Sequence, residues 1–273
     1  MWVLPKFVGQ NVPAVQVAFL RYAAGVVCIA PFFINDVVRG RAVAAVQQSG
    51  RRLFVMHMAR AACGVCSLAF GAYAVTRIPL ANAQAIALTN GVFTLLFAVM
   101  FLRERVGVRE AVAAMIALCG AVIVAGPGTS AATGLAVAGV LAAFAQAIAW
   151  GGEVILLRAT AARESPSRIL FKVNVMAAVM VLVVGAVYWE SLSLDAFLLI
   201  IAMGPIAIIG QLLNIYAFRL ANATALVPVR YSGIIFAAIF GILIFGEWPQ
   251  PSAIIGAVMI VGGAMWLALR PGR

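Results

Sequence analysis

Residues 73–104 read YAVTRIPLANAQAIALTNGVFTLLFAVMFLRE, and residues 216–247 read YAFRLANATALVPVRYSGIIFAAIFGILIFGE. The two stretches share identical residues at an offset of 143, and these pairs include Tyr73 and Tyr216, Ala74 and Ala217, Phe93 and Phe236, Phe97 and Phe240, and Glu104 and Glu247. The correspondence continues through Gly120, which matches Gly263. Each copy reads as a long apolar helix that ends in glutamate, a polar turn and a second apolar helix. The sequence therefore predicts an internal duplication.

The composition predicts a membrane protein. The chain is 65% hydrophobic and only 10% charged, and its mean hydropathy is +1.11. A membrane-spanning helix needs about 20 apolar residues. Nine segments qualify: 12–34, 53–75, 79–101, 107–126, 133–157, 169–189, 195–217, 223–245 and 250–269. The loops between them are too short for a soluble domain, so we expect an all-α integral membrane protein.

The basic residues predict the orientation. One set of alternate loops holds thirteen arginines: Arg39, Arg41, Arg51, Arg52, Arg103, Arg105, Arg109, Arg158, Arg163, Arg168, Arg219, Arg270 and Arg273. The other set holds only Lys6 and Arg77. By the positive-inside rule the first set faces the cytoplasm, which predicts a cytoplasmic C-terminus. The same bias accounts for the net charge of +11, so nucleic-acid binding is not expected.

This orientation makes the two copies inverted. Glu104 falls on the cytoplasmic side and Glu247 on the outer side, the arrangement that secondary transporters use for alternating access. We expect a first repeat over residues 1–126 and a second over 133–270. Inversion requires an odd number of helices per repeat, so ten helices are expected where nine are seen. The first helix of the first repeat is predicted to be missing.

Several ordered motifs carry a family resemblance. They are VPAVQVAFLR at 12–21, AYAVTRIPLANA at 72–83, FLRER at 101–105, GAVIVAGPG at 120–128, YAFRLANA at 216–223, FGE at 245–247 and GG at 262–263. In this order and spacing the chain resembles the EamA family of the drug/metabolite transporter superfamily. The resemblance implies ten helices and transport of small metabolites. The sequence departs from the family in lacking the first helix and in having Asn90-Gly91 where relatives carry a mid-helix proline.

Polar residues inside the apolar segments predict a substrate site, because charge at the bilayer centre is costly and usually faces a cavity or a partner. The candidate substrate-binding residues are Arg60, Asn90, Gln146, Trp150, Glu153, Gln211, Asn214, Arg230 and Tyr231. Two arginines against one glutamate leave net positive charge, which suits a substrate with a carboxylate or another anionic group.

Structural explanations stay open beside this one. Arg60 and Arg230 can extend to the headgroups, and Glu153 can serve as an ion-pair partner alone. Arg21, Glu104 and Glu247 are interpreted as structural. His57, near a helix start, is interpreted as interfacial. Glu153 is taken to be the only buried carboxylate able to carry a proton.

Other function classes are not supported. Cys63 and Cys66 lie in an apolar segment with one histidine in the whole chain, so no metal site is expected. No cofactor motif and no catalytic group indicating an enzyme is found. We predict a secondary transporter of a small polar metabolite in the bacterial inner membrane: amino-acid-like, vitamin or nucleoside-like. The alternative is a truncated or non-transporting membrane subunit. Proton coupling and a homodimer are left open.

Overall fold

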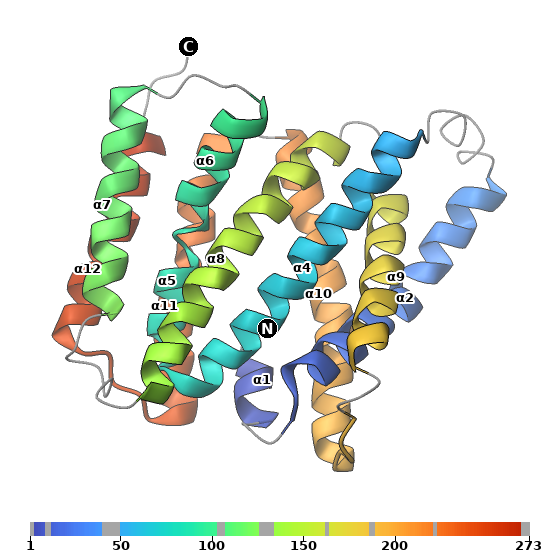
Figure 1. The fold of residues 1–273 in the computed structure, drawn as a ribbon, viewed down its shortest axis with the longest axis horizontal. Helices are drawn as coiled ribbons and strands as arrows, with labels where there is room; N and C mark the ends of the chain where they lie inside the picture. Colours follow the sequence, from blue (N-terminus) through green and yellow to red (C-terminus); the bar gives the residue numbers. More distant parts are fainter. Residues whose placement is uncertain are drawn as a thin grey trace. The chain divides into compact units, whose positions relative to one another are not determined.

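The computed structural model describes residues 3–8, 12–39, 50–102, 107–125, 134–161, 164–185, 189–220 and 223–268 (Figure 1). Every regular element in these ranges is a helix. They are α1 (Val3–Val8), α2 (Ala14–Val38), α4 (Arg51–Arg77), α5 (Leu80–Ala87), α6 (Asn90–Leu102), α7 (Val108–Ala125), α8 (Gly134–Ala161), α9 (Pro166–Gly185), α10 (Leu194–Leu220), α11 (Ala223–Phe245) and α12 (Pro251–Ala268). The expectation of an all-α fold is confirmed.

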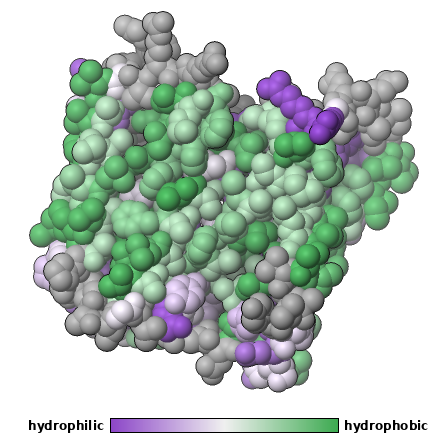
Figure 2. Space-filling view, viewed as in Figure 1, coloured by the Kyte–Doolittle hydropathy of each residue, from purple (hydrophilic) through white to green (hydrophobic). Residues whose placement is uncertain are grey.

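Apolar length and apolar surface both indicate a membrane environment. Among the described residues, seven helical stretches are long and apolar enough to cross a bilayer: 14–38, 51–77, 80–101, 108–125, 136–161, 166–183 and 194–217. Shorter apolar helices cover 232–245 and 251–266. Hydrophobic residues cover most of the face seen in Figure 2, and large side chains such as Val122, Val183 and Leu243 are exposed. Exposed apolar surface of this kind fits contact with lipid.

The predicted segment 79–101 is not one continuous helix. It divides at Leu88 and Thr89 into α5 and α6. The Thr89 hydroxyl donates to the Ile86 carbonyl at 2.7 Å, and the amide of Thr89 donates to the same carbonyl at 3.0 Å. These contacts three residues apart tighten the helix into a 3₁₀-type turn. The break directly precedes Asn90-Gly91, the pair noted in the sequence as standing where relatives carry a mid-helix proline.

The helix bounds repeat at the offset seen in the sequence. α10 begins and ends 143 residues after α4, at Leu194 and Leu220. The α5–α6 stretch from Leu80 to Leu102 recurs at the same offset as α11, and α7 recurs as α12. The duplication therefore holds for helix positions as well as for residue identities.

The chain divides into two compact units. Unit 1 comprises residues 3–69 and 153–220, and unit 2 comprises residues 70–152 and 221–273. Each unit therefore contains parts of both predicted repeats, and the division falls inside α4 and inside α8.

In unit 1, α2 packs against α9 and α10. The α2–α9 pair is antiparallel, because Gly25 lies beside Asn174 and Phe33 stacks on Phe171 with ring centroids 4.2 Å apart. At the end of α2, the Ser167 hydroxyl donates to the Asp36 carboxylate. A buried cluster beside these helices consists of Ile29, Leu157, Ala161, Ile169, Leu170, Ile208 and Ile215.

In unit 2, α7 and α12 form the most extensive helix pair. A Cβ added at Gly120 would lie 2.6 Å from the Gly256 carbonyl oxygen, and one added at Gly263 would lie 3.1 Å from the Ala113 carbonyl oxygen. The two helices are therefore antiparallel. At the offset of 143, Gly263 is the counterpart of Gly120, and Gly256 is the counterpart of Ala113. Exchanging the two repeats therefore converts the Gly120–Gly256 contact into the Gly263–Ala113 contact. Inverted repeats predict such reciprocal contacts.

Candidate substrate site

Three residues of α4 build one buried face in unit 1. His57, Arg60 and Gly64 are all buried, and their spacing of three and four places them on neighbouring turns of the same side. His57 and Arg60 are each 1% exposed. Two polar side chains within a membrane-spanning helix are thus buried.

Arg60 faces a carboxylate on α8. Its Nη2 atom lies 3.8 Å from Oε1 of Glu153, whose side chain is 18% exposed. This distance is an ion-pair contact but too long for a hydrogen bond. Within the described ranges, Nε and Nη1 of Arg60 are buried without a hydrogen-bond partner. Arg60 therefore contacts Glu153 within unit 1 and keeps donor capacity that Glu153 does not use.

Gly64 of α4 and Tyr22 of α2 lie beside the Glu153 carboxylate. A Cβ added at Gly64 would lie 2.9 Å from the Tyr22 hydroxyl and 3.7 Å from Oε2 of Glu153. The absent side chain at Gly64 lets the Tyr22 hydroxyl approach α4, while the Glu153 carboxylate lies at an ordinary contact distance. The Arg21 guanidinium lies over the Tyr22 ring, with Cζ 4.1 Å from the ring centroid, a cation–π contact.

The charge of this cluster is positive. Arg21 and Arg60, both buried, stand against the single carboxylate of Glu153. An unpaired buried cation is costly, and a negatively charged group that binds beside the two guanidiniums would offset that cost. The arrangement can therefore bind an anionic group through charge-assisted hydrogen bonds.

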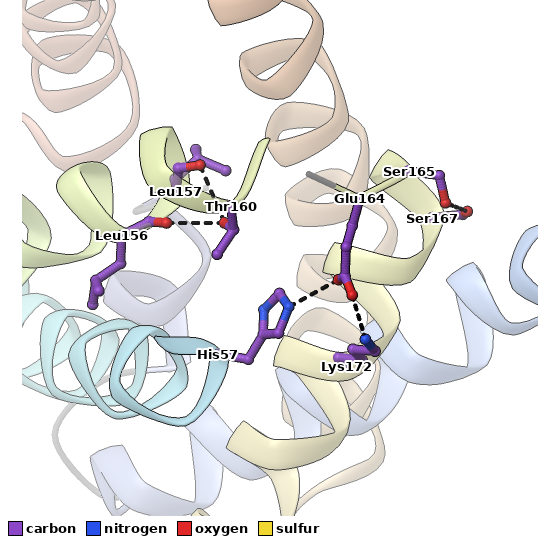
Figure 3. A network of polar contacts seen from close by, with 8 residues as sticks. All are labelled: His57, Leu156, Leu157, Thr160, Glu164, Ser165, Ser167 and Lys172. Atoms are coloured by element: carbon purple, nitrogen blue, oxygen red, sulfur yellow. Dashed lines mark hydrogen bonds and ion pairs between the residues drawn. The ribbon is translucent and has the colours of Figure 1, made fainter. Parts of the chain in front are cut away.

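A second polar cluster in unit 1 lies between α4, α9 and the turn before α9 (Figure 3). His57 Nε2 lies 2.8 Å from Oε2 of Glu164, and Lys172 Nζ donates to Oε1 of the same residue at 2.5 Å. Figure 3 shows both side chains converging on this one carboxylate. Glu164 reaches His57 from the turn before α9, and both side chains are buried. The interpretation of His57 as interfacial stays a prediction.

The electrostatics of Glu164 follow from these contacts. Burial raises the pKa of the Glu164 carboxyl, but the hydrogen bonds and charges of His57 and Lys172 outweigh burial and lower the pKa from 4.5 to about 2. Glu164 is therefore ionised at neutral pH and binds the turn to α4 and α9. Glu164 is thus a second buried carboxylate, but the expectation that Glu153 is the only one able to carry a proton stays a prediction.

Sequence reasoning missed Tyr22, Glu164 and Lys172. A signal existed for Lys172, because a lysine inside the predicted segment 169–189 is as costly as the intramembrane arginines that were noted. Glu164 gave no such signal, since it lies between two predicted segments and reads as a solvated loop residue. Tyr22 reads as an ordinary packing aromatic.

The remaining candidates fall in several places. Asn90 and Gln146 are buried in unit 2, and Trp150 is half-buried there. In unit 1, Gln211 is half-buried and the exposed Asn214 donates its amide to the Gly210 carbonyl at 3.2 Å. Of the predicted substrate-binding residues, the contacts described here link Arg60 to Glu153. They do not link either of these two to Asn90, Gln146, Trp150, Gln211 or Asn214.

Three predicted residues lie wholly or partly outside the described residues. Glu104 is outside them altogether, and Arg230 and Tyr231 lie on α11 with side chains that are outside them. The residues interpreted as structural have clear contacts where they are described. Glu247 Oε2 accepts a hydrogen bond from the Leu80 amide at 2.9 Å, which caps the start of α5. Arg21 packs on Tyr22 as described above.

Apolar helices duplicated along the chain, with buried charges inside the spans, define a multi-pass membrane transporter. The EamA-like transporter family matches residues 1–126 and 137–269. The chain belongs to this family, and the resemblance noted in the sequence is confirmed.

Relatives of known function are transporters of different compounds. The chain is similar to a pseudopaline exporter of Pseudomonas aeruginosa, with 30% identity over 96% of this chain and 88% of the relative. It is 27% identical to an S-adenosylmethionine uptake transporter of Rickettsia bellii, over 97% of this chain and 87% of the relative. It is 26% identical to a riboflavin transporter of Brucella anthropi, over 94% and 88%.

A solved crystal structure supports the fold. It aligns with a TM-score of 0.66 at 19% identity and covers 96% of this chain and 89% of that chain. At this level of identity the likeness concerns the fold alone.

Proposed function

We propose that this protein moves a small polar metabolite with an anionic group across the bacterial inner membrane by alternating access. The observation that carries the proposal is Arg60, a buried arginine in a membrane-spanning helix with one carboxylate at 3.8 Å and unpartnered Nε and Nη1 atoms among the described residues. Charged groups inside membrane spans are costly and mark substrate or ion pathways.

The relatives support a small-metabolite substrate without fixing its identity. Pseudopaline, S-adenosylmethionine and riboflavin differ widely in structure, and one relative is an exporter while another is an uptake transporter. We therefore propose the class of a polar metabolite, which is amino-acid-like, vitamin or nucleoside-like, and leave the direction to experiment. The excess of positive charge around Arg21 and Arg60 favours a carboxylate or another anionic group.

The other candidates complete the proposal. Asn90, Gln146, Trp150, Gln211, Asn214, Arg230 and Tyr231 are proposed to line the pathway during the transport cycle. The C-terminus is proposed to face the cytoplasm, following the distribution of arginine in the loops.

Reconstitution tests the function. Proteoliposomes that contain the purified chain are loaded with a deproteinised bacterial metabolite extract, and exchange is followed by mass spectrometry. We expect compounds with carboxylate or phosphate groups to exchange, and exchange to fall when Arg60 is replaced by Gln. Absence of exchange for every compound, with the protein folded and inserted, would overturn the proposal.

A further inference from the structure

We infer that the substrate is a zwitterion, whose carboxylate is held by Arg60 and whose protonated amine is held by Glu153. The inference rests on the proposed function and narrows its substrate class. It uses only contacts within unit 1, where Tyr22, Arg60, Gly64 and Glu153 converge.

The donors of Arg60 that lack a partner would bind the carboxylate of the ligand. Its Nη2 atom points to Glu153, while Nε and Nη1 are buried with no hydrogen-bond partner among the described residues. Nε and Nη1 lie on different edges of the guanidinium, because Nη1 is on the side of Cδ, so each of them donates a separate hydrogen bond. Buried donors of this kind are normally satisfied, and an anionic ligand group beside Arg60 would satisfy one of them.

Glu153 would bind the protonated amine of the ligand. Its carboxylate makes no hydrogen bond with Arg60 at 3.8 Å and is more exposed than its partner, at 18% against 1%. Its second oxygen, Oε2, lies beside Gly64, where α4 has no side chain. An ionised carboxylate accepts several hydrogen bonds, so Glu153 retains the capacity to bind an ammonium group.

Electrostatics favours one ligand with both charges. A purely anionic ligand bound to Arg60 would offset the net positive charge of Arg21 and Arg60, but it would also place a second negative group next to Glu153, and these two would repel each other at close range. A purely cationic ligand bound to Glu153 would likewise be repelled by the positive charge of Arg60. A zwitterion matches both groups, and the short separation of Arg60 and Glu153 requires its two charges to be close together, as in an amino acid.

The experiment sorts transported compounds by charge. Proteoliposomes exchange the same bacterial metabolite extract, and each transported compound is identified by mass spectrometry. Compounds that carry both a carboxylate and a protonated amine are expected. Transport restricted to compounds that lack one of these groups would overturn the inference and leave the proposed function standing. Absence of all transport would overturn the proposed function itself.

Variants then test the role of Glu153. For the transported zwitterion, Glu153→Gln is expected to raise KM by roughly ten- to a hundredfold, which corresponds to one lost charge-assisted hydrogen bond. The KM for the N-acetylated form, which has no ammonium group, is expected to fall, because the variant removes the repulsion between Glu153 and a purely anionic ligand. Glu190→Gln, an exposed carboxylate of the same unit, is the matched control and leaves both values as in the wild type.

Two results would contradict the assignment. An equal rise in KM for the free and the N-acetylated compound would make Glu153 a structural partner of Arg60 only. If Glu153→Gln fails to fold, the wild-type protein decides, because N-acetylation alone must then weaken binding by a similar factor. Equal binding of the two compounds by the wild type would overturn the inference.

Discussion

Gly120 of α7 and Gly256 of α12 pack backbone against backbone in unit 2. A Cβ at Gly256 would lie only 2.4 Å from the Gly120 carbonyl oxygen and 2.6 Å from Cγ2 of Val124. The reciprocal contact of Gly263 with Ala113 repeats this relationship at the offset of 143 residues. Small residues allow such close approach of membrane helices, so this pair holds the last helices of the two copies together.

Gly256→Ala is expected to destabilise the protein. Because backbone atoms cannot give way as a flexible side chain does, the added methyl should cost about 1–3 kcal/mol, the usual cost of overpacking. The free energy of unfolding in detergent micelles measures the effect. Gly262→Ala on the same helix is the control, since nothing lies within 4 Å of its Cβ position. Equal stability of the two variants would contradict the close packing.

Glu247→Ala is expected to weaken the start of α5. The lost hydrogen bond from the Leu80 amide to Glu247 should cost about 0.5–2 kcal/mol, as for other lost caps. Glu247→Gln keeps an acceptor oxygen and should lose less. Chemical unfolding of the three proteins in one detergent compares them, and an unchanged Glu247→Ala variant would show that the cap does not matter.

Gly64→Ala is expected to clash with Tyr22. The added methyl would lie 2.9 Å from the Tyr22 hydroxyl, so transport and thermal stability should both fall, the latter by about 1–3 kcal/mol. Tyr22→Phe removes the hydroxyl and should rescue much of the loss in the double variant, because contacting residues are not additive.

The control for this pair is Gly210→Ala, which has nothing within 4 Å of its Cβ position. It is expected to match the wild type in transport and stability. Purely additive effects of Gly64→Ala and Tyr22→Phe would contradict the contact between these residues.

Glu164 predicts an acid-dependent loss of stability. Its pKa is lowered from 4.5 to about 2, so the unfolded chain takes up a proton at higher pH than the folded chain. The stabilisation is therefore complete above pH 4.5 and is lost as the pH falls towards 2. Unfolding free energies measured across this range should decline less steeply in Glu164→Gln. Identical slopes for the two proteins would contradict the paired state of Glu164.

Helix positions were predictable because a membrane span needs an unbroken apolar run. Because the sequence is duplicated, the helix positions in the first copy also predict those in the second. The break at Leu88 and Thr89 was not predicted, since it depends on the hydrogen bonds of Thr89 with the Ile86 carbonyl. Partners such as His57 and Glu164, which are 107 residues apart, depend on the tertiary packing of three segments. No local pattern in the sequence carries that information.

The candidate site was also predicted only in part. The cost of burying charge in a bilayer pointed to Arg60 and Glu153 without any structure, and both occur in one cluster of unit 1. The role of Gly64 was not predictable, because a glycine in an apolar helix reads as a packing residue. Its meaning depends on the Tyr22 hydroxyl, which α2 brings to the same place.

Glu153→Gln tests whether Glu153 is an ion-pair partner or a proton carrier. As the partner of Arg60 at 3.8 Å, Glu153 is expected to support transport through its fixed negative charge. The variant should then lower the transport rate or the stability while leaving the pH optimum where it is in the wild type. Reconstituted transport of the identified substrate, measured across pH for both proteins, gives the comparison.

A shifted pH profile in a well-folded Glu153→Gln protein would instead assign proton coupling to this residue, because removing the group that takes up the proton removes its titration from the rate. Glu190→Gln again serves as the control and should follow the wild-type profile. A Glu153→Gln protein with wild-type rate, pH profile and stability would defeat both roles. The pairing with Arg60 would then have no part in transport, and the substrate would have to bind elsewhere along the spans.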